Sequence, residues 1–195
     1  MSITTDAEDR DRADMERLAA GHGAALNELM ERHSTPVFHF LCRMLGNEDD
    51  AVDLAQETFV RVYRAREGFR SNSKFSSWLY AIAANLARNH FRWRARHPNV
   101  SLDIPAGAGE EPLGSTLPAK EPGPRESALA HERTEAVRAA VRRLPEDLRE
   151  AVVLCEWEDK SVAEAAEILG ATVKGVESRL YRARKLLRQQ LHQWL

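Results

Sequence analysis

The sequence lacks the features of a membrane-spanning, secreted or disulfide-stabilised protein. No apolar run approaches the about 20 residues that a membrane span needs, and the acidic start does not show the basic-then-apolar pattern of a signal peptide. The two cysteines, Cys42 and Cys155, lie far apart and form no CxxC pair, so we expect reduced packing residues. These absences predict a cytoplasmic protein without membrane insertion.

The sequence also lacks the motifs of catalysis and of metal binding. It contains no Gly-rich phosphate loop and no constellation of a nucleophile with a base. His39 and Cys42 lie three residues apart, and His33 precedes them by one or two helical turns, but their apolar neighbours favour core packing and no fourth ligand is evident. We therefore expect no enzyme, no metal site and no cofactor.

The formal net charge of −2 conceals a strong segregation of charge along the chain. Residues 1–63 carry 6 basic and 13 acidic groups (−7), residues 64–97 carry 8 and 1 (+7), residues 98–170 carry 8 and 15 (−7), and residues 171–195 carry 6 and 1 (+5). Two separated basic blocks predict two contacts with a polyanion. The acidic blocks indicate either that the chain screens its own basic blocks or that it binds a second, basic partner.

The first basic block contains the stretch 69–96, FRSNSKFSSWLYAIAANLARNHFRWRAR, in which a polar loop precedes an amphipathic helical pattern. Its aromatic residues after the loop are Phe75, Trp78, Tyr80, Phe91 and Trp93. Cations neutralise phosphates and aromatic rings stack on unpaired bases, so the stretch predicts nucleic-acid binding. Asn85 interrupts the apolar pattern, which indicates either a capping role or recognition of a base. The alternative is a solvated basic helix whose aromatic residues belong to the core.

Helical periodicity on both sides of residues 98–130 predicts an all-α chain of two small helical domains joined by a Pro/Gly-rich linker. The linker holds six of the eight prolines and four of the ten glycines. We expect a polar, frayed N-terminal segment and then the two domains. The predicted boundaries are 1–23 for the polar segment, 24–97 for the first domain, 98–130 for the linker and 131–195 for the second domain.

Local signals divide the domains into helices. Thr35-Pro36 has the composition of an N-cap and first turn, which favours two helices or one kinked helix between residues 24 and 45. Gly46-Asn47 closes that segment. A helix is then predicted over residues 47–66, and one of its faces is polar. The alternative to a functional role for this face is that its side chains are simply solvated. The polar face consists of Asp50, Asp53, Gln56 and Glu57.

The second domain ends in a helix-turn-helix pattern. Ser161 and Glu164 form an S-x-x-E capping box, Gly170 lies where that helix ends, and Thr172 caps a longer basic helix. A short helix, a Gly-containing turn and a basic second helix are typical of DNA-binding helix-turn-helix units. An ordinary helical hairpin with a basic surface is the alternative.

Four ordered segments resemble bacterial sigma factors of the extracytoplasmic-function group in the sigma-70 family. They are DAVDLAQETFVRVYR (50–64), FRSNSKFSSWLYAIAANLARN (69–89), LPEDLREAVVL (144–154) and VAEAAEILGATVKGVESRLYRARKLLR (162–188). The resemblance extends from about residue 24 to residue 191. It implies sigma region two, a short linker and region four, without regions one and three.

The resemblance also implies partners and site residues. The polymerase-binding face would be Asp50, Asp53, Gln56 and Glu57. The minus-ten promoter element would be opened and recognised by Arg70, Ser71, Asn72, Lys74, Trp78, Asn85, Arg88, Arg92 and Arg94, with Arg96 holding a flanking phosphate. The minus-thirty-five element would be bound by Lys174, Glu177, Ser178, Arg179, Tyr181, Arg182 and Arg184. The implied partners are core RNA polymerase, promoter DNA and an anti-sigma factor.

The sequence departs from the family at residues 174–177, which are Lys-Gly-Val-Glu where Gly-Thr-Val-Lys is frequent. A carboxylate at Glu177 repels phosphate but accepts a hydrogen bond from a cytosine amino group, so base preference does not transfer from relatives. The rival hypothesis is a regulator that binds an operator through its helix-turn-helix without polymerase. That hypothesis leaves the stretch 69–96 without a role, and it predicts that the free chain binds duplex DNA.

Overall fold

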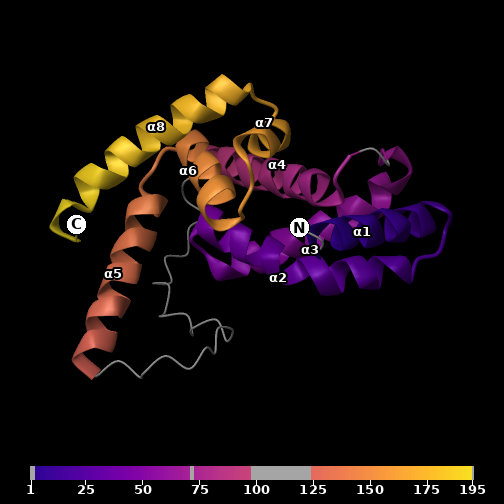
Figure 1. Cartoon of the computed structure of the whole chain (residues 1–195), viewed down its shortest axis with the longest axis horizontal. Helices are drawn as coiled ribbons and strands as arrows, with labels where there is room; N and C mark the ends of the chain where they lie inside the picture. Colours follow the sequence, from indigo (N-terminus) through magenta and orange to yellow (C-terminus); the bar gives the residue numbers. More distant parts are fainter. Residues whose placement is uncertain (1–2, 71–72, 98–123, 195) are drawn as a thin grey trace.

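The computed structural model describes residues 3–70, 73–97 and 124–194, and every regular element in these ranges is helical (Figure 1). The elements are α1 (Ile3–Ala19), α2 (Ala25–Leu45), α3 (Glu48–Ala65), η1 (Arg66–Gly68), α4 (Phe75–Arg96), α5 (Pro124–Arg142), α6 (Glu146–Val152), the π-helical turn η3 (Val153–Trp157), α7 (Val162–Leu169), α8 (Val173–Gln190) and η4 (His192–Trp194). The prediction of an all-α fold is confirmed. Most of the predicted linker lies outside the described residues, and α5 begins inside its predicted range.

The N-terminal segment is a packed helix, so the prediction of a frayed start was wrong. On α1, Met15 and Leu18 are buried against the core. Asp11 accepts hydrogen bonds from Arg32 Nε at 2.9 Å and from His33 Nε2 at 2.8 Å, both on α2. The high density of charged residues led to the prediction of a frayed polar segment. The segment is instead a helix that α2 holds in place through ion pairs and apolar contacts.

Of the two alternatives predicted around Thr35-Pro36, two helices or one kinked helix, the structure excludes the first, because α2 runs through Pro36 as one helix. Proline removes one backbone donor from the helix interior and so costs a hydrogen bond. The helix nevertheless buries Phe40, Leu41 and Met44 beyond that point. Tertiary packing of this apolar face outweighs the local preference for a break.

The end of α2 follows the predicted pattern. Gly46 adopts the left-handed conformation at φ 70°, and its N–H donates to the carbonyl of Cys42. Asn47 then caps α3, its side chain accepting from the N–H of Asp50 at 2.9 Å. Arg142 of α5 also lies against Gly46, since a Cβ there would meet its Cδ at 2.8 Å. The glycine therefore serves both a helix end and a close contact with the second domain.

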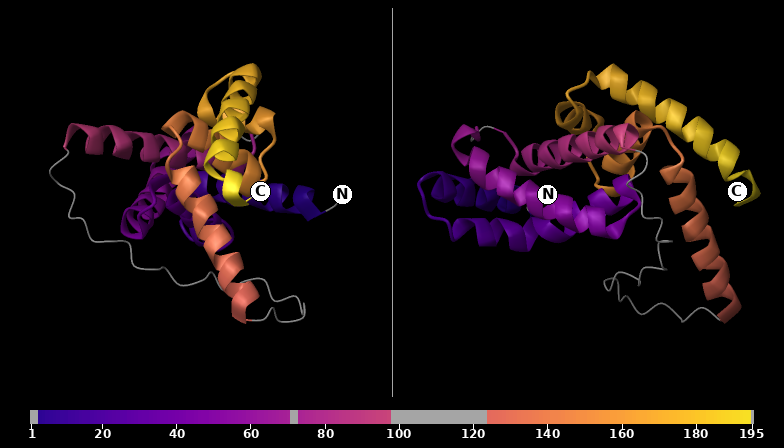
Figure 2. Two further views of the ribbon diagram at one scale, coloured as in Figure 1. Left: turned by 90° about the vertical axis from the view of Figure 1, so that its left-hand side faces the viewer. Right: turned by 180° about the vertical axis from the view of Figure 1, so that it is seen from behind.

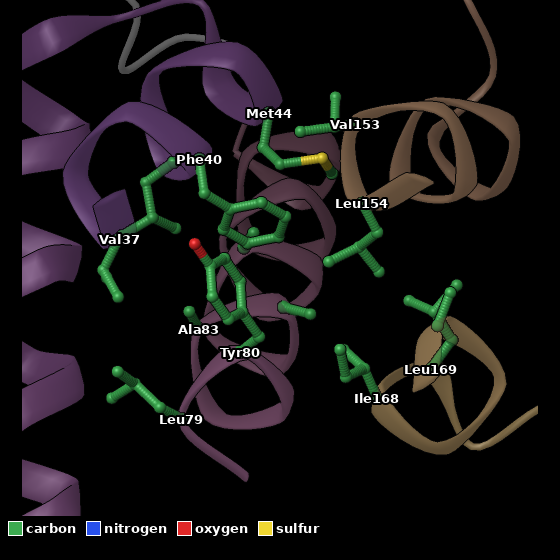
Figure 3. Packing of buried hydrophobic residues seen from close by; sticks show 14 of the residues in the cluster. Val37, Phe40, Met44, Leu79, Tyr80, Ala83, Val153, Leu154, Ile168 and Leu169 are labelled. Atoms are coloured by element: carbon green, nitrogen blue, oxygen red, sulfur yellow. The ribbon is translucent and has the colours of Figure 1, made fainter. Parts of the chain in front are cut away.

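The helices α1–α4 and α5–α8 form two domains that share one apolar core. Helix α7 lies against α4, and α6 lies against α8 and α2, whereas α5 and the end of α8 extend outward (Figures 1 and 2). At the junction, Phe40, Met44 and Tyr80 of the first domain meet Val153 and Leu154 of the second (Figure 3). The rings of Phe40 and Tyr80 pack edge to face, with centroids 5.2 Å apart. None of the described helices is both long and apolar enough to cross a membrane.

Candidate nucleic-acid interface

Helix α4 organises the predicted minus-ten residues. Its buried side is made by residues at helical spacing, among them Phe75, Leu79, Ala83 and Leu86. Asn85 lies on the exposed side of the same helix. The amphipathic pattern thus places Asn85 outside the core, as the predicted DNA-binding role requires. Its side-chain amide can therefore form hydrogen bonds.

Arg88 connects Asn85 to the second domain. One terminal nitrogen of Arg88 donates to the side-chain oxygen of Asn85. The other lies 3.2 and 3.3 Å from the two carboxylate oxygens of Glu150 on α6. Glu150 is only 3% exposed, and burial raises its pKa while the positive charge of Arg88 opposes the rise. An acid of the other domain therefore engages Arg88 directly, and Arg88 in turn holds the side chain of Asn85.

Lys74, which precedes α4, bridges two further acids. Its ammonium lies 2.8 Å from Glu8 of α1 and 3.1 Å from Glu164 of α7. The hydrogen bonds from Lys74 to these two carboxylates raise the pKa of its ammonium. Like Arg88, Lys74 is a predicted minus-ten residue that an acid of the second domain contacts.

The aromatic residues of the stretch 69–96 divide between core and surface. Phe75 and Tyr80 are buried, so in this conformation they are core residues and not stacking platforms, which agrees with the alternative left open by the sequence. Trp78 is half-buried and packs on Phe69, with ring centroids 5.2 Å apart. Trp93 is exposed near the end of α4. Only the Trp78 and Trp93 side chains of these four keep substantial exposure.

The other predicted minus-ten residues lie at the two ends of this region. Arg70 is exposed, whereas Ser71 and Asn72 fall outside the described residues. Arg92 and Arg94 are exposed on the last turns of α4, which project from the body (Figure 2, left). Arg94 lies 3.4 Å from Asp50 of α3.

Helix α3 carries the predicted polymerase-binding face. Asp53 and Gln56 are exposed, and Glu57 pairs with Arg61 one turn further at 2.8 Å. Asp50 differs from them because it is half-buried and lies near both His90 and Arg94 of α4. The exposed face thus centres on Asp53 and Gln56, while Asp50 also joins α3 to α4.

The helix-turn-helix is built as the local signals predict. Ser161 and Glu164 form a complete capping box at the start of α7, and Gly170 ends it in the left-handed conformation at φ 60°. Thr172 caps α8 by accepting from the N–H of Gly175 at 3.1 Å. Val176, Leu180 and Ala183 bury one side of α8. These signals are local in sequence, so they identify the unit without knowledge of its tertiary contacts.

The exposed side of α8 displays most of the predicted minus-thirty-five residues. The exposed members are Lys174, Glu177, Ser178, Tyr181, Arg182 and Arg184. Tyr181 is 72% exposed, whereas Arg179 is half-buried. Arg179 and Arg182 lie 3.9 and 3.6 Å from Asp147, and Arg184 lies 2.7 Å from Glu156. Exposed pairs of this kind are weak, so DNA phosphates can replace the carboxylates.

Three important residues at the junction of the domains were not predicted as site residues. They are Arg149, Glu150 and Glu158. Glu158 accepts from Tyr80 at 2.6 Å and from Arg43 at 2.8 Å. Glu150 and Arg149 follow Leu148 on α6, where charged residues adjoin a buried apolar face. The position of charged residues next to a buried apolar face was the available sequence signal for these residues. It does not identify the residues of the other domain that they contact.

The capping box of α7 makes a testable contribution to stability. Hydrogen bonds from Ser161 and Lys74 lower the pKa of Glu164 from 4.5 to about 2. Because the folded pKa is depressed, the stabilisation is present above about pH 4.5 and is lost as the pH falls through 2. We expect Glu164→Gln to lower the free energy of unfolding at pH 7 by about 1 kcal/mol. Urea denaturation at pH 7, 4 and 3 measures this difference, which should shrink with decreasing pH.

Glu167→Gln is the matched control, because Glu167 lies exposed on the same helix and the charge change is identical. It should leave the stability nearly unchanged at each pH. An equal loss in both variants, or a loss at Glu164 that does not depend on pH, would contradict the role assigned to the capping box.

Comparisons with known proteins agree with this architecture. Residues 29–97 match the model of Sigma-70 region 2, and residues 134–187 match that of Sigma-70, region 4. The chain is 33% identical to the RNA polymerase sigma-H factor of Pseudomonas aeruginosa over 92% of this chain and 93% of the relative. It is 34% identical to the ECF RNA polymerase sigma-E factor of Haemophilus influenzae over 93% of this chain and 95% of the relative.

A solved structure extends the similarity to both domains. CnrH in complex with the cytosolic domain of CnrY superposes with a TM-score of 0.68 at 27% identity, covering 94% of this chain and 97% of CnrH. Among the described residues, no group of three or more His, Cys, Asp or Glu side chains is arranged to hold a metal ion. The order of the matched regions and the nearly full coverage leave one conclusion. The chain belongs to the sigma-70 family of RNA polymerase sigma factors, in its extracytoplasmic-function group.

Proposed function

We propose that this chain binds core RNA polymerase and directs it to promoters. Region two (α2–α4) melts and recognises the minus-ten element, and region four (α5–α8) recognises the minus-thirty-five element. The observation that carries the proposal is the presence in one chain of two cationic helices, α4 and α8, and of an exposed acidic face on α3. The chain acts as an initiation factor, and the chemistry of RNA synthesis belongs to the polymerase.

The exposed face of α3 supports docking on the polymerase. Asp53 and Gln56 lie beside exposed apolar side chains, Val60 and Tyr63, which gives the face both charge and apolar area. Interfaces of this kind combine apolar contact with charge complementarity. We therefore propose a basic polymerase surface as the partner of α3, with Asp53 at the centre of the contact.

Strand opening is assigned to the loop before α4 and to α4 itself. An unpaired base needs a ring to stack on and a polar group that recognises its edge. Trp78 supplies a half-buried ring and Asn85 supplies an amide on the exposed side of the helix. Arg92 and Arg94 add positive charge for the flanking phosphates. Release of the carboxylates that now engage Arg88 and Lys74 would complete the site.

Region four is tested by Arg182→Ala. Arg182 is exposed near the middle of α8, the helix that we propose to enter the major groove. If Arg182 contacts a base, its loss should weaken binding by about 1–3 kcal/mol, or about 5- to 150-fold, and relax specificity at one position. The measurement is the selection of upstream promoter sequences from randomised DNA by polymerase loaded with each variant.

Arg188→Ala is the matched control, because Arg188 lies exposed in the last turn of the same helix. It should weaken binding slightly and equally for all sequences. Unchanged sequence preference in Arg182→Ala would contradict base recognition by that residue and leave it at most a phosphate contact.

We also propose an anti-sigma factor as a partner. CnrH is solved with the cytosolic domain of CnrY bound to it, and this chain shares the two-domain arrangement of CnrH. A polypeptide that binds both domains would control access to polymerase. Because bacterial polymerase is cytoplasmic, we place the chain in the cytoplasm. An operator-binding regulator remains the alternative, and binding of duplex DNA without polymerase would favour it.

A further inference from the structure

A buried network of ion pairs joins α1 to α2. Asp11 of α1 is 4% exposed and accepts from Arg32 Nε at 2.9 Å and from His33 Nε2 at 2.8 Å. Asp14 is also buried and pairs with the same Arg32. Replacing a buried ion pair with apolar residues is often neutral for stability, so the burial of two carboxylates here suits a role in fixing geometry. All four residues belong to the first domain, so the network lies within that domain.

His33 connects this network to the start of α4. Its ring packs edge to face on the ring of Phe75, the first residue of α4, with centroids 5.1 Å apart. An ionised carboxylate only accepts hydrogen bonds, so the bond to Asp11 places a proton on Nε2 and fixes the rotation of the imidazole. The His33 side chain is 16% exposed, so little space is left for it to reorient. The carboxylate of Asp11 therefore sets the angle at which His33 meets Phe75.

Phe75 in turn supports two partly exposed aromatic residues. Its ring centroid lies 6.1 Å from that of Phe69 and 6.2 Å from that of Trp78, and the last two rings are 5.2 Å apart. Aromatic pairs at these separations favour defined tilted or edge-to-face arrangements. Trp78 is the ring that we propose to stack on an unpaired base. Its orientation therefore depends on a chain of contacts that begins at Asp11 and passes through His33 and Phe75.

Helix α1 also borders the segment that precedes α4. It packs on η1 as well as on α2 and α4 (Figure 1). A cavity of about 190 Å³ between α1 and η1 is lined by Met15, Glu16, Ala19, Arg66, Glu67 and Phe69. Lys74 pairs with Glu8 of α1 at 2.8 Å, but both side chains are partly exposed, so a DNA phosphate can replace Glu8 there. The lasting contact of α1 with this surface is therefore the buried network.

We propose that α1 positions the minus-ten recognition surface, with Asp11 and His33 as positioning residues that set the orientation of Phe75 and Trp78 before DNA binds. The inference rests on the proposed function, because the stacking role of Trp78 belongs to it. Helix α1 precedes residues 29–97, which match Sigma-70 region 2, so the recognition unit extends beyond that range. A ring that is already oriented lowers the cost of ordering on binding. Both positioning residues act through Phe75, not through contact with DNA.

The first measurement uses the free chain and needs no polymerase. Fluorotryptophan incorporated at the four tryptophans gives fluorine NMR resonances, and Trp78→Phe and Trp93→Phe identify two of them. We expect His33→Ala and Asp11→Asn to displace or broaden the Trp78 resonance. The Trp93 resonance should stay in place, because Trp93 lies near the other end of α4. An unchanged Trp78 resonance in both variants would overturn the proposal.

His39→Ala is the matched control. It removes an imidazole from the same helix, and that imidazole packs on Phe38 with ring centroids 5.6 Å apart. The Trp78 resonance should therefore stay in place in this variant, and an equal displacement would contradict the proposal. If circular dichroism shows that His33→Ala does not fold, Asp11→Asn decides the test, because it keeps the volume of the side chain and an acceptor oxygen for Arg32.

Promoter opening shows the functional consequence. The assay is permanganate reactivity of minus-ten thymines with polymerase loaded with each variant, on a promoter that run-off transcription identifies. We expect both positioning variants to slow opening at least about 5-fold, the equivalent of about 1 kcal/mol of base stacking. Polymerase affinity should stay within about twofold of the parent chain and of His39→Ala. Opening at the parent rate, or an equal loss of polymerase affinity, would overturn the positioning role.

Failure of the positioning role and failure of the proposed function give different results. If the parent chain opens promoters and the positioning variants open them equally fast, α1 has no such role and the sigma function stands. If the parent chain with polymerase produces no start sites, the proposed function fails. The fluorine resonances then still decide whether Asp11 and His33 orient Trp78.

Discussion

Asp53→Arg is expected to weaken binding of the chain to core RNA polymerase by about 10- to 100-fold. Asp53 is exposed on α3 and faces away from the core, so the change reverses a charge at the proposed docking surface without disturbing packing. Like charges across an interface are strongly unfavourable, and each tenfold loss corresponds to about 1.4 kcal/mol. Gel filtration and fluorescence titration against the purified core enzyme measure the effect.

Asp9→Arg provides the matched charge reversal at a distant exposed position. Asp9 lies on α1 and pairs only loosely with Arg12 at 3.2 Å, between exposed side chains. This variant should bind polymerase within about twofold of the parent chain. If the two reversals weakened binding equally, the effect would be one of overall charge and α3 would lose its assignment as the docking helix.

Arg149→Ala is expected to cause the largest loss of stability among the single substitutions considered. The guanidinium of Arg149 donates to the carbonyls of Met44, Arg142 and Leu144, the last at 3.0 Å, and lies 5.5 Å from the ring of Phe91. These carbonyls belong to the ends of α2 and α5 and to the turn before α6, so one side chain joins three segments. Burial lowers the pKa of the Arg149 guanidinium.

Removing this side chain leaves several backbone acceptors at the junction without their donor. An unsatisfied buried polar group costs about 1–3 kcal/mol, so we expect a loss of about 2–4 kcal/mol in the free energy of unfolding, measured by urea denaturation. Arg149→Lys should recover only part of it, because an ammonium does not reproduce the planar fork of donors. Arg138→Ala, at an exposed arginine of α5, should cost less than 0.5 kcal/mol by the same measurement. A similar cost for Arg138→Ala would refute the assignment.

Elements whose signals are local could be predicted from the sequence. The capping box of Ser161 and Glu164, the left-handed Gly170 and the Thr172 cap each act within four residues, and all three occur as expected. The amphipathic pattern of α4 likewise places Asn85 on the surface and Leu79 in the core. These features depend on helix geometry alone, so no knowledge of the tertiary structure was needed.

Features that depend on distant partners could not be predicted. Pro36 predicts a helix start from its own chemistry, but the buried face that holds α2 together comes from other helices. The charges of α1 indicate a solvated segment until Asp11 is placed beside Arg32 and His33. Glu150 shows the same limit, because its partner Arg88 lies 62 residues away in the other domain.

The assignment of residues to polymerase, minus-ten and minus-thirty-five contacts therefore stays a prediction with a structural basis. The structure places Asp53, Asn85 and Arg182 on three separate exposed faces, which suits three separate partners. It also places Glu150, Glu158 and Glu164 of the second domain in contact with Arg88, Arg43 and Lys74 of the first, pairs that lie too far apart in the chain to be predicted. Variants at the three faces should affect three different measurements, and equal losses in all of them would point to misfolding.

The most direct test of the central claim is gel filtration of the purified chain with bacterial core RNA polymerase, followed by run-off transcription from a pool of genomic DNA. A sigma factor should co-elute with the core enzyme and generate new, specific start sites. Absence of any association, together with protection of duplex DNA by the free chain, would contradict the account and identify an operator-binding regulator instead.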